Sequence, residues 1–186
     1  MSQYRALTLT SEGTLRVIST ECGISEAFST FEIQQGLPLP EVKQFTAIWD
    51  TGASSSAISP RVVRELGLIP TGWGFSDTAS GRAKVQKYGV NIILPSNVGF
   101  TSVEVSCNNM KIDILIGMDI ITKGDFSITN KKGKTIFTFQ TPSSHVIDFR
   151  AEIDKYNAMH ASWVKHGNNK CPCGSGLAWD KCHGKV

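Results

Sequence analysis

Short segments in which apolar and polar residues alternate run through residues 1–141, and they constrain the fold more than any other feature of the chain. Alternation with a period of two is typical of strands with one buried face. It predicts strands at Arg5–Leu9, Thr14–Ser19, Phe45–Trp49, Lys84–Leu94, Phe100–Val105, Ile112–Ile116, Phe126–Thr129 and Thr135–Phe139. The first two strands are expected to form a hairpin around the turn at residues 11–13. The sequence therefore predicts a mainly β domain.

Two segments have the features of helices. Pro60–Leu66 follows Ser59, a good N-terminal cap, and stops at Gly67, a residue typical of helix ends. Residues 148–166 repeat apolar positions every three or four residues, which predicts an amphipathic helix after the break at residues 142–144. This second helix either packs on the β domain or forms a free connecting arm.

Composition limits the functional classes. A chain of 186 residues with 40% hydrophobic residues can bury one core and carry a small appendage, and a net charge of +3 does not indicate nucleic-acid binding. The first residues do not resemble a secretory signal, and two aspartates interrupt the longest apolar run, Ile112–Ile121, which is too short to cross a membrane. Three of the five cysteines lie at residues 171–182, which favours metal binding in a reducing compartment. We therefore expect a cytoplasmic protein.

The segment Ala47–Ser55 carries the first sign of chemistry. An apolar strand runs directly into Asp50, and Thr51 and Gly52 then turn the chain. A carboxylate at a buried strand end is costly unless it is paired or hydrogen-bonded, and such groups are often functional. The alternative interpretation is an ordinary aspartate that accepts hydrogen bonds from the amides of its own turn.

A second apolar strand follows at Ile112–Ile116 and ends in Gly117, with Asp119 near the start of a short helix. In combination with Asp50-Thr51-Gly52-Ala53, this order resembles the retropepsin-like aspartic proteases: Asp-Thr-Gly-Ala, a short helix, a flap hairpin and a hydrophobic-hydrophobic-Gly motif. The resemblance covers approximately Phe31–Phe139. It implies a closed β-barrel of the kind that forms one half of an acid protease.

The resemblance also implies roles for individual residues. Asp50 would supply the catalytic carboxylate, Thr51 would hold the two active-site loops together across a dimer axis, and Gly52 would allow close approach of substrate. A flap hairpin is expected within Trp73–Val85, where Trp73 and Phe75 either pack in the core or contact substrate. The residues expected to bind substrate are Ala53, Thr78, Ala79, Ser80 and Gly81.

The chain departs from many viral members of this family. They have acidic residues after the triad and an arginine after the later glycine, whereas this chain has Ser54, Ser55 and Met118. Both sides of the ion pair that braces the viral dimer are therefore missing together. Cellular and bacterial relatives are the closer comparison.

The chemistry of an aspartic protease needs two carboxylates that share one proton. No other aspartate in the chain is followed by Thr-Gly or Ser-Gly, as Asp77, Asp113, Asp119 and Asp125 show. The second carboxylate is therefore expected from Asp50 of another copy, which a symmetric homodimer provides.

The C-terminal cysteines have the spacing of a metal site. Cys171, Cys173, Cys182 and His183 offer four ligands within a segment too small to have a core, which predicts one structural zinc ion per chain. Residues 171–176, Cys-Pro-Cys-Gly-Ser-Gly, strongly resemble the SEC-C motif, best known at the end of the bacterial preprotein translocase motor. That resemblance implies recruitment of a partner such as a chaperone or the ribosome. Solvated lysines are the commoner explanation for the basic residues of the tail, so nucleic acid is not an expected partner.

These observations predict three parts: a retropepsin-like domain at residues 1–141, a helical linker at 142–169 and a SEC-C motif at 170–186. The function expected is that of a bacterial, homodimeric aspartic endopeptidase, in which paired Asp50 carboxylates activate water and a zinc tail recruits partner or substrate. Two alternatives remain open. One is a catalytically silent, retropepsin-like peptide-binding module, and the other is a SEC-C adaptor of the translation or secretion machinery.

Overall fold

The computed structural model of the protein describes residues 3–28, 34–36, 38–78, 81–165, 170–171 and 173–182, without the side chains of 77–78, 160–165 and 180. The chain divides into two units, Met1–Ser144 and His145–Val186, which are described separately. Within the described residues, no helix is both long enough and apolar enough to cross a membrane.

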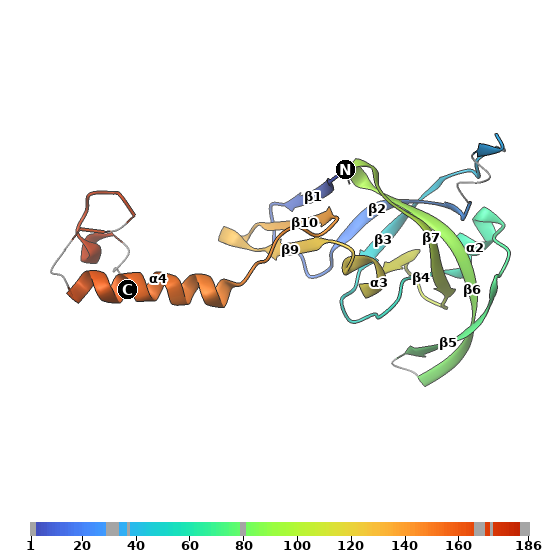
Figure 1. Cartoon of the computed structure of the whole chain (residues 1–186). Helices are drawn as coiled ribbons and strands as arrows, with labels where there is room; N and C mark the ends of the chain where they lie inside the picture. Colours follow the sequence, from blue (N-terminus) through green and yellow to red (C-terminus); the bar gives the residue numbers. More distant parts are fainter. Residues whose placement is uncertain are drawn as a thin grey trace. The chain divides into compact units, whose positions relative to one another are not determined.

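Strands form most of the first unit (Figure 1). Its strands are β1 (Arg5–Ser11), β2 (Ser19–Glu26), β3 (Lys43–Trp49), β4 (Ala57–Ile58), β5 (Gly72–Thr78), β6 (Gly81–Leu94), β7 (Val98–Cys107), β8 (Ile114–Ile116), β9 (Asp125–Thr129) and β10 (Thr135–Thr141). Within the described residues, its helices with defined bounds are α2 (Pro60–Leu66) and α3 (Met118–Ile121), with 3-10 turns η1 (Pro95–Asn97) and η2 (Lys131–Gly133).

The larger sheet closes into a barrel. Its strand order is β2-β3-β8-β4-β7-β6-β5, and an additional pairing of β2 with β6 joins the two sides. Strand β5 lies outside this ring and, within the described residues, pairs only with β6, so the two strands form a hairpin that projects from the barrel (Figure 1). The prediction of a mainly β fold with a closed barrel is confirmed.

Branched aliphatic and aromatic side chains form the core of the first unit. They come from the barrel strands, from β10 and from α2 and α3, and their alternation along the strands explains why the sequence pattern predicted strands here. The largest fully buried residues are Phe137, Phe139, Ile24, Ile58, Ile92, Leu94, Ile114, Ile116, Ile120, Val62, Val90 and Val98.

The smaller sheet has the order β1-β10-β9, and it corrects one prediction. The expected hairpin of Arg5–Leu9 with Thr14–Ser19 does not form: β1 pairs along its whole length with β10, and the next strand starts only at Ser19. The reason is burial. Leu7 and Leu9 lie opposite Phe139 and Phe137 of β10, and these aromatic partners offer more apolar surface than a short local hairpin does.

Local signals predicted the first helix correctly. The Ser59 hydroxyl accepts a hydrogen bond from Val62 N at 3.5 Å, and Gly67 ends α2 with a left-handed φ of 63°. This conformation costs glycine little, and the sequence alone indicated both caps.

The second unit contains α4 (Phe149–Lys165), in agreement with the helix predicted at residues 148–166, and the 3-10 turn η3 (Trp179–Lys181). Asp148 begins α4, because its Oδ1 accepts a hydrogen bond from Ala151 N at 3.0 Å. After the helix, Cys171 N donates to Leu177 O at 2.6 Å, which closes a small loop around the cysteine cluster.

Candidate functional site

Asp50 stands where β3 leaves the barrel. Strand β3 runs parallel to β8, and the backbone N–H of Asp50 donates to Ile116 O at 2.9 Å, which extends this pairing by one residue. Gly52 N then donates to Asp50 Oδ1 at 2.8 Å. The carboxylate therefore organises its own turn, as the alternative interpretation of the sequence expected, and Asp50 is still partly exposed.

The two residues that follow β8 support this loop at close range. A Cβ atom on Gly117 would lie only 2.6 Å from the carbonyl carbon of Ser55, so the backbones touch without room for a side chain. Met118 N donates to Ala53 O at 2.8 Å. The hydrophobic-hydrophobic-Gly segment thus fixes the position of the loop that carries Asp50.

The buried hydroxyl of Ser56 completes this support, and sequence reasoning missed it. Its Oγ accepts a hydrogen bond from Gly117 N at 3.0 Å and donates to Asp119 Oδ1 at 2.8 Å. In the sequence, Ser56 is the third of three consecutive serines, and nothing distinguishes it from its exposed neighbours Ser54 and Ser55.

A polar cleft of about 400 Å³ lies against the Asp50 loop. On one side it is lined by Asp50, Gly52 and Ala53, and its opposite wall includes Phe75 of β5. Ser54, Ser55, Ala57, Ser76, Ser106, Asn108 and Leu115 line the remainder. The loop and the predicted flap hairpin therefore enclose the same space, although α2 separates them in the chain.

The predicted flap corresponds to the β5–β6 hairpin, whose last described pair is Thr78 opposite Gly81. The predicted tip residues Ala79 and Ser80, and the side chain of Thr78, lie outside the described residues. Trp73 and Phe75 are both 62% exposed, so neither packs in the core.

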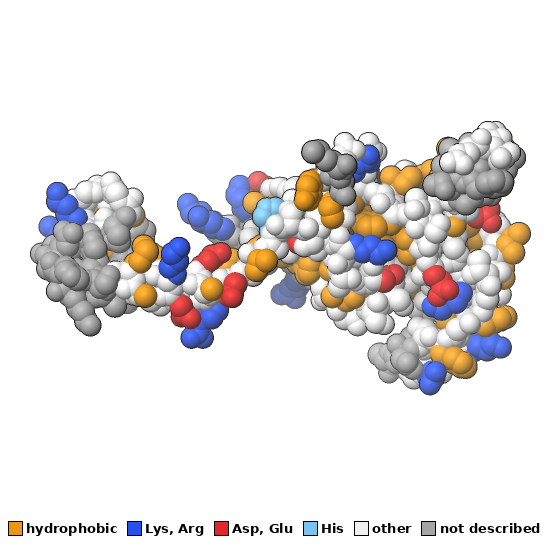
Figure 2. Space-filling model, viewed as in Figure 1, with side chains coloured by type: hydrophobic (Ala, Val, Ile, Leu, Met, Phe, Trp, Pro, Cys, Tyr) orange, Lys and Arg blue, Asp and Glu red, His pale blue; other side chains and the backbone are white. Residues whose placement is uncertain are grey.

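Each exposed aromatic ring of the hairpin is covered by a cation from the neighbouring strand. Lys84 Nζ lies 4.5 Å from the ring centre of Trp73, and Arg82 Cζ lies 4.5 Å from that of Phe75. Cation–π contacts of this kind hold both partners near one conformation. Figure 2 shows hydrophobic and basic side chains gathered on this hairpin.

A second, more apolar cleft of about 260 Å³ lies on another side of the same loop. Asp50 and Thr51 line it together with Val17, Phe126 and Ile128, which belong to the smaller sheet and the segment after β1. Its other lining residues are Arg16, Ile18, Ile48, Trp49, Ile121 and Phe137. Asp50 thus stands between a polar and an apolar cleft.

In the second unit, the sulfur atoms of Cys171, Cys173 and Cys182 all lie within 4.8 Å of one another, and those of Cys173 and Cys182 are 3.6 Å apart. Zinc–sulfur bonds of about 2.3 Å in a tetrahedron place sulfur atoms about 3.8 Å apart, so the three thiols fit a zinc ion. Hydrogen bonds from Ser175 lower the pKa of the Cys173 thiol to about 6. The predicted fourth ligand, His183, lies outside the described residues.

Two parts of the chain, one around each candidate site, match known protein families. Residues 33–120 match the aspartyl protease family. Residues 168–185 match the SEC-C motif. Both resemblances predicted from the sequence are therefore confirmed, and the aspartyl protease match spans the Asp50 loop, the hairpin and β8.

Among solved structures, a retropepsin-like aspartic protease from Rickettsia conorii is similar, with 13% identity and a TM-score of 0.45 over 76% of this chain and 98% of that chain. The protease of simian foamy virus (mac) is similar over 56% of this chain and 91% of that chain, with 18% identity and a TM-score of 0.35. No curated protein sequence matches the chain.

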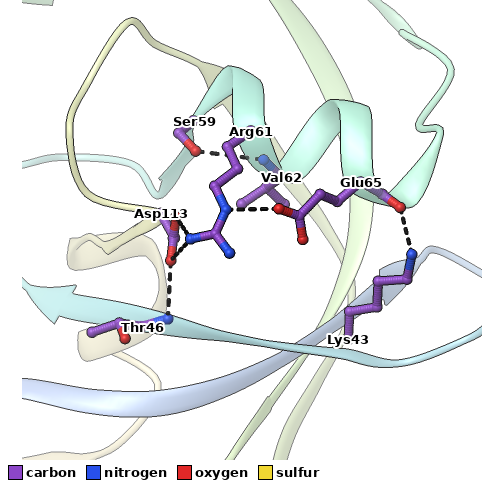
Figure 3. Close-up of polar contacts among 7 residues, drawn as sticks. All are labelled: Lys43, Thr46, Ser59, Arg61, Val62, Glu65 and Asp113. Atoms are coloured by element: carbon purple, nitrogen blue, oxygen red, sulfur yellow. Dashed lines mark hydrogen bonds and ion pairs between the residues drawn. The ribbon is translucent and has the colours of Figure 1, made fainter.

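Asp113 of the aspartyl protease region holds α2 against the barrel. Arg61 Nη1 donates to its Oδ1 at 3.2 Å, and Thr46 N donates to its Oδ2 at 3.4 Å (Figure 3). Arg61 also donates to Glu65 Oε1 at 2.7 Å, and this hydrogen bond, followed by the charge of Asp113, raises the pKa of Arg61. Asp113 is a structural carboxylate in this arrangement.

The carboxylates of Asp119 and Asp125 are engaged as well. Asp119 accepts from Ser56, and Asp125 accepts from the hydroxyl of Ser143 and from Ser144 N, the latter at 2.7 Å. Among the described side chains, neither of these aspartates nor Asp113 lines a cleft that contains Asp50.

Proposed function

We propose that the protein is a homodimeric aspartic endopeptidase, in which the Asp50 carboxylates of two copies activate a water molecule for attack on a peptide bond. The observation that carries the proposal is the position of Asp50. It stands at the end of β3, held by the amide of Gly52, and opens onto a cleft whose other wall is the β5–β6 hairpin. The aspartyl protease match supports the same function.

The chemistry divides between the two carboxylates. One acts as a base toward water, and the other, protonated, polarises the carbonyl of the scissile bond. Gly52 leaves room beside Asp50 for substrate, because a Cβ atom at this position would lie 3.1 Å from Asp50 Oδ1. Thr51, exposed next to the catalytic carboxylate, would join the two loops across the dimer axis.

We assign substrate binding to Ala53, which lines the polar cleft, and to Thr78, Ala79, Ser80 and Gly81, the flap residues that the family resemblance implies. An extended peptide in the cleft would lie between Ala53 and Phe75. Its backbone would meet polar groups on the loop side and the ring of Phe75 on the hairpin side.

A second copy supplies the missing acid. Among the described side chains, which do not include that of Asp77, no carboxylate other than that of Asp50 lines either cleft, and Asp113, Asp119 and Asp125 are engaged elsewhere. A twofold axis next to Asp50 would bring the residue against its own mate.

We further propose the division into residues 1–141, 142–169 and 170–186, with zinc bound in the last part by Cys171, Cys173, Cys182 and His183. Four protein ligands leave zinc no open position, so a bound ion would be structural. The tail would then recruit a protein partner or substrate. Zinc binding requires these thiols to be reduced, and reduced thiols suit a reducing compartment, so we propose a cytoplasmic location.

The decisive experiment compares Asp50→Asn with Asp113→Asn on a diverse peptide pool, with dimerisation and thermal unfolding measured alongside. We expect Asp50→Asn to abolish cleavage and to remain folded, because the shape of the side chain is kept and the shared proton is lost. Asp113→Asn is the matched control, and it should still cleave. Cleavage that persists in Asp50→Asn refutes the proposal, and peptide binding without cleavage by the wild type supports the silent peptide-binding alternative.

A further inference from the structure

Asn108 lines the polar cleft and is held firmly through its backbone. It directly follows β7, where its N–H donates to Ile58 O at 3.0 Å and its carbonyl oxygen accepts from Met110 N at 2.8 Å. The same cleft contains Asp50. The barrel therefore fixes where the side-chain amide of Asn108 starts relative to a peptide bound in this cleft.

Protein groups match only one end of this amide. Asn108 Nδ2 donates to Ser76 Oγ of the hairpin strand β5 at 3.3 Å. Asn108 Oδ1, by contrast, is the only buried polar atom among the described side chains that has no hydrogen bond. A buried acceptor without a donor is costly, and its persistence in a cleft indicates that it serves another purpose than folding.

Asn91 shows how a structural asparagine is bound in the same barrel. Its Nδ2 donates to Ser25 Oγ at 3.3 Å and to Glu26 O at 3.1 Å, and its Oδ1 accepts from Ser102 N at 2.9 Å. Both ends of its amide are thus used by the protein. Asn108 differs, since one end of its amide has no partner within the described residues.

The charge of the cleft narrows what could fill it. Hydroxyl groups line it beside Asn108, and Asp50 is the one charged residue among the described residues that line it; the hydroxyl-bearing residues are Ser54, Ser55, Ser76 and Ser106. A charged substrate side chain would leave water here with no counter-charge other than the carboxylate needed for catalysis. An apolar side chain would leave the amide of Asn108 unmatched. An uncharged side chain that forms hydrogen bonds avoids both costs.

We propose that Asn108 and Ser76 form a subsite that selects an asparagine or glutamine side chain of the substrate. This inference rests on the proposed peptidase and names a substrate class for it. A primary amide carries donors and an acceptor, so it can pair with both ends of the Asn108 amide. The last side-chain torsion of asparagine is soft, which lets either end of Asn108 turn toward the bound group. Sites built for hydrogen bonds discriminate strongly against analogues that lack them.

Matched peptides test the subsite. A peptide that the full-length protein cleaves would carry asparagine or leucine, which have nearly the same shape, at each position in turn on either side of the cleaved bond. We expect kcat/KM to be about tenfold higher with asparagine at one of these positions, and Asn108→Leu to remove this preference. Asn157→Leu, the same substitution at an exposed position of α4, is the matched control and should keep it.

Two results would overturn the subsite: a preference for asparagine that persists in Asn108→Leu, or no position at which the wild type distinguishes asparagine from leucine. Circular dichroism checks that Asn108→Leu folds. If it does not, Ser76→Ala decides, because Ser76 lies on the hairpin that projects from the barrel. Ser76→Ala should weaken the preference for asparagine, and an unchanged preference in this variant contradicts the proposal.

Peptide binding separates this inference from the proposed function. Asp50→Asn keeps the shape of the cleft, so its affinities for the asparagine and leucine peptides can be measured without cleavage. A tenfold difference in affinity that Asn108→Leu removes, in a protein whose wild type cleaves no peptide, contradicts the protease and leaves the subsite standing. A wild type that cleaves both peptides equally well contradicts the subsite and leaves the protease standing.

Discussion

At the level of single residues, close backbone contacts with Gly117 and Met118 hold the loop that carries Asp50. Asp50, Thr51, Gly52 and Gly117 could be identified from the sequence because a recognisable motif contains them. Ser56 could not, since the value of its hydroxyl depends on β8 and α3 arriving beside it. Partners that are distant in the chain leave no local pattern.

Gly117→Ala should destabilise the protein by about 1–3 kcal/mol and reduce peptide cleavage, because the new Cβ would collide with the backbone of Ser55 and displace the Asp50 loop. Gly13→Ala is the matched control, as no atom lies within 4 Å of its added Cβ. Denaturant unfolding and kcat/KM are the measurements. Equal effects of the two substitutions would contradict the close contact.

Ser56→Ala should cost about 1–3 kcal/mol of folding free energy, because it leaves the amide of Gly117 and the carboxylate of Asp119 without this shared partner. Ser54→Ala, at an exposed position, should change the free energy of unfolding little. Unfolding in urea compares the two variants, and similar midpoints would show that the buried hydroxyl contributes little.

At the level of elements, locally determined features were predictable and non-local pairings were not. Helix α2 was predicted together with both caps, since a few adjacent residues determine them. The partner of β1 was predicted wrongly, because the choice between a nearby strand and β10 depends on buried aromatic surface far along the chain. The hairpin of β5 and β6 was found through the family resemblance.

The β5–β6 hairpin offers a matched pair of aromatic residues for a test of its role. Trp73 and Phe75 are equally exposed and each contacts a cation, but only Phe75 lines the polar cleft. Phe75→Ala should lower kcat/KM about tenfold through lost substrate contact, and Trp73→Ala should lower it less. Steady-state kinetics on one peptide is the measurement, and a larger loss with Trp73→Ala would contradict the assignment of Phe75 as the substrate contact.

At the level of the whole molecule, the two units should respond differently to metal removal. Chelation should unfold the cysteine cluster, because the segment that carries its three thiols is too short to fold on a core of its own, while the barrel keeps its melting temperature. Metal analysis should find one zinc ion per chain. Cys171→Ser combined with Cys182→Ser should lose zinc and still cleave short peptides; loss of cleavage would place the tail in the active dimer.

The pairing of β1 with β10 determines how early the first unit can complete its fold during synthesis. Arg5 lies opposite Thr141, so the smaller sheet can form only after β10, the last strand of the first unit, has been synthesised. Strand β9 becomes a defined edge only when β10 is in place. In a chain still emerging from the ribosome, the barrel strands could therefore pair before the smaller sheet does, and the apolar cleft that this sheet lines beside Asp50 would be completed only at the end of synthesis.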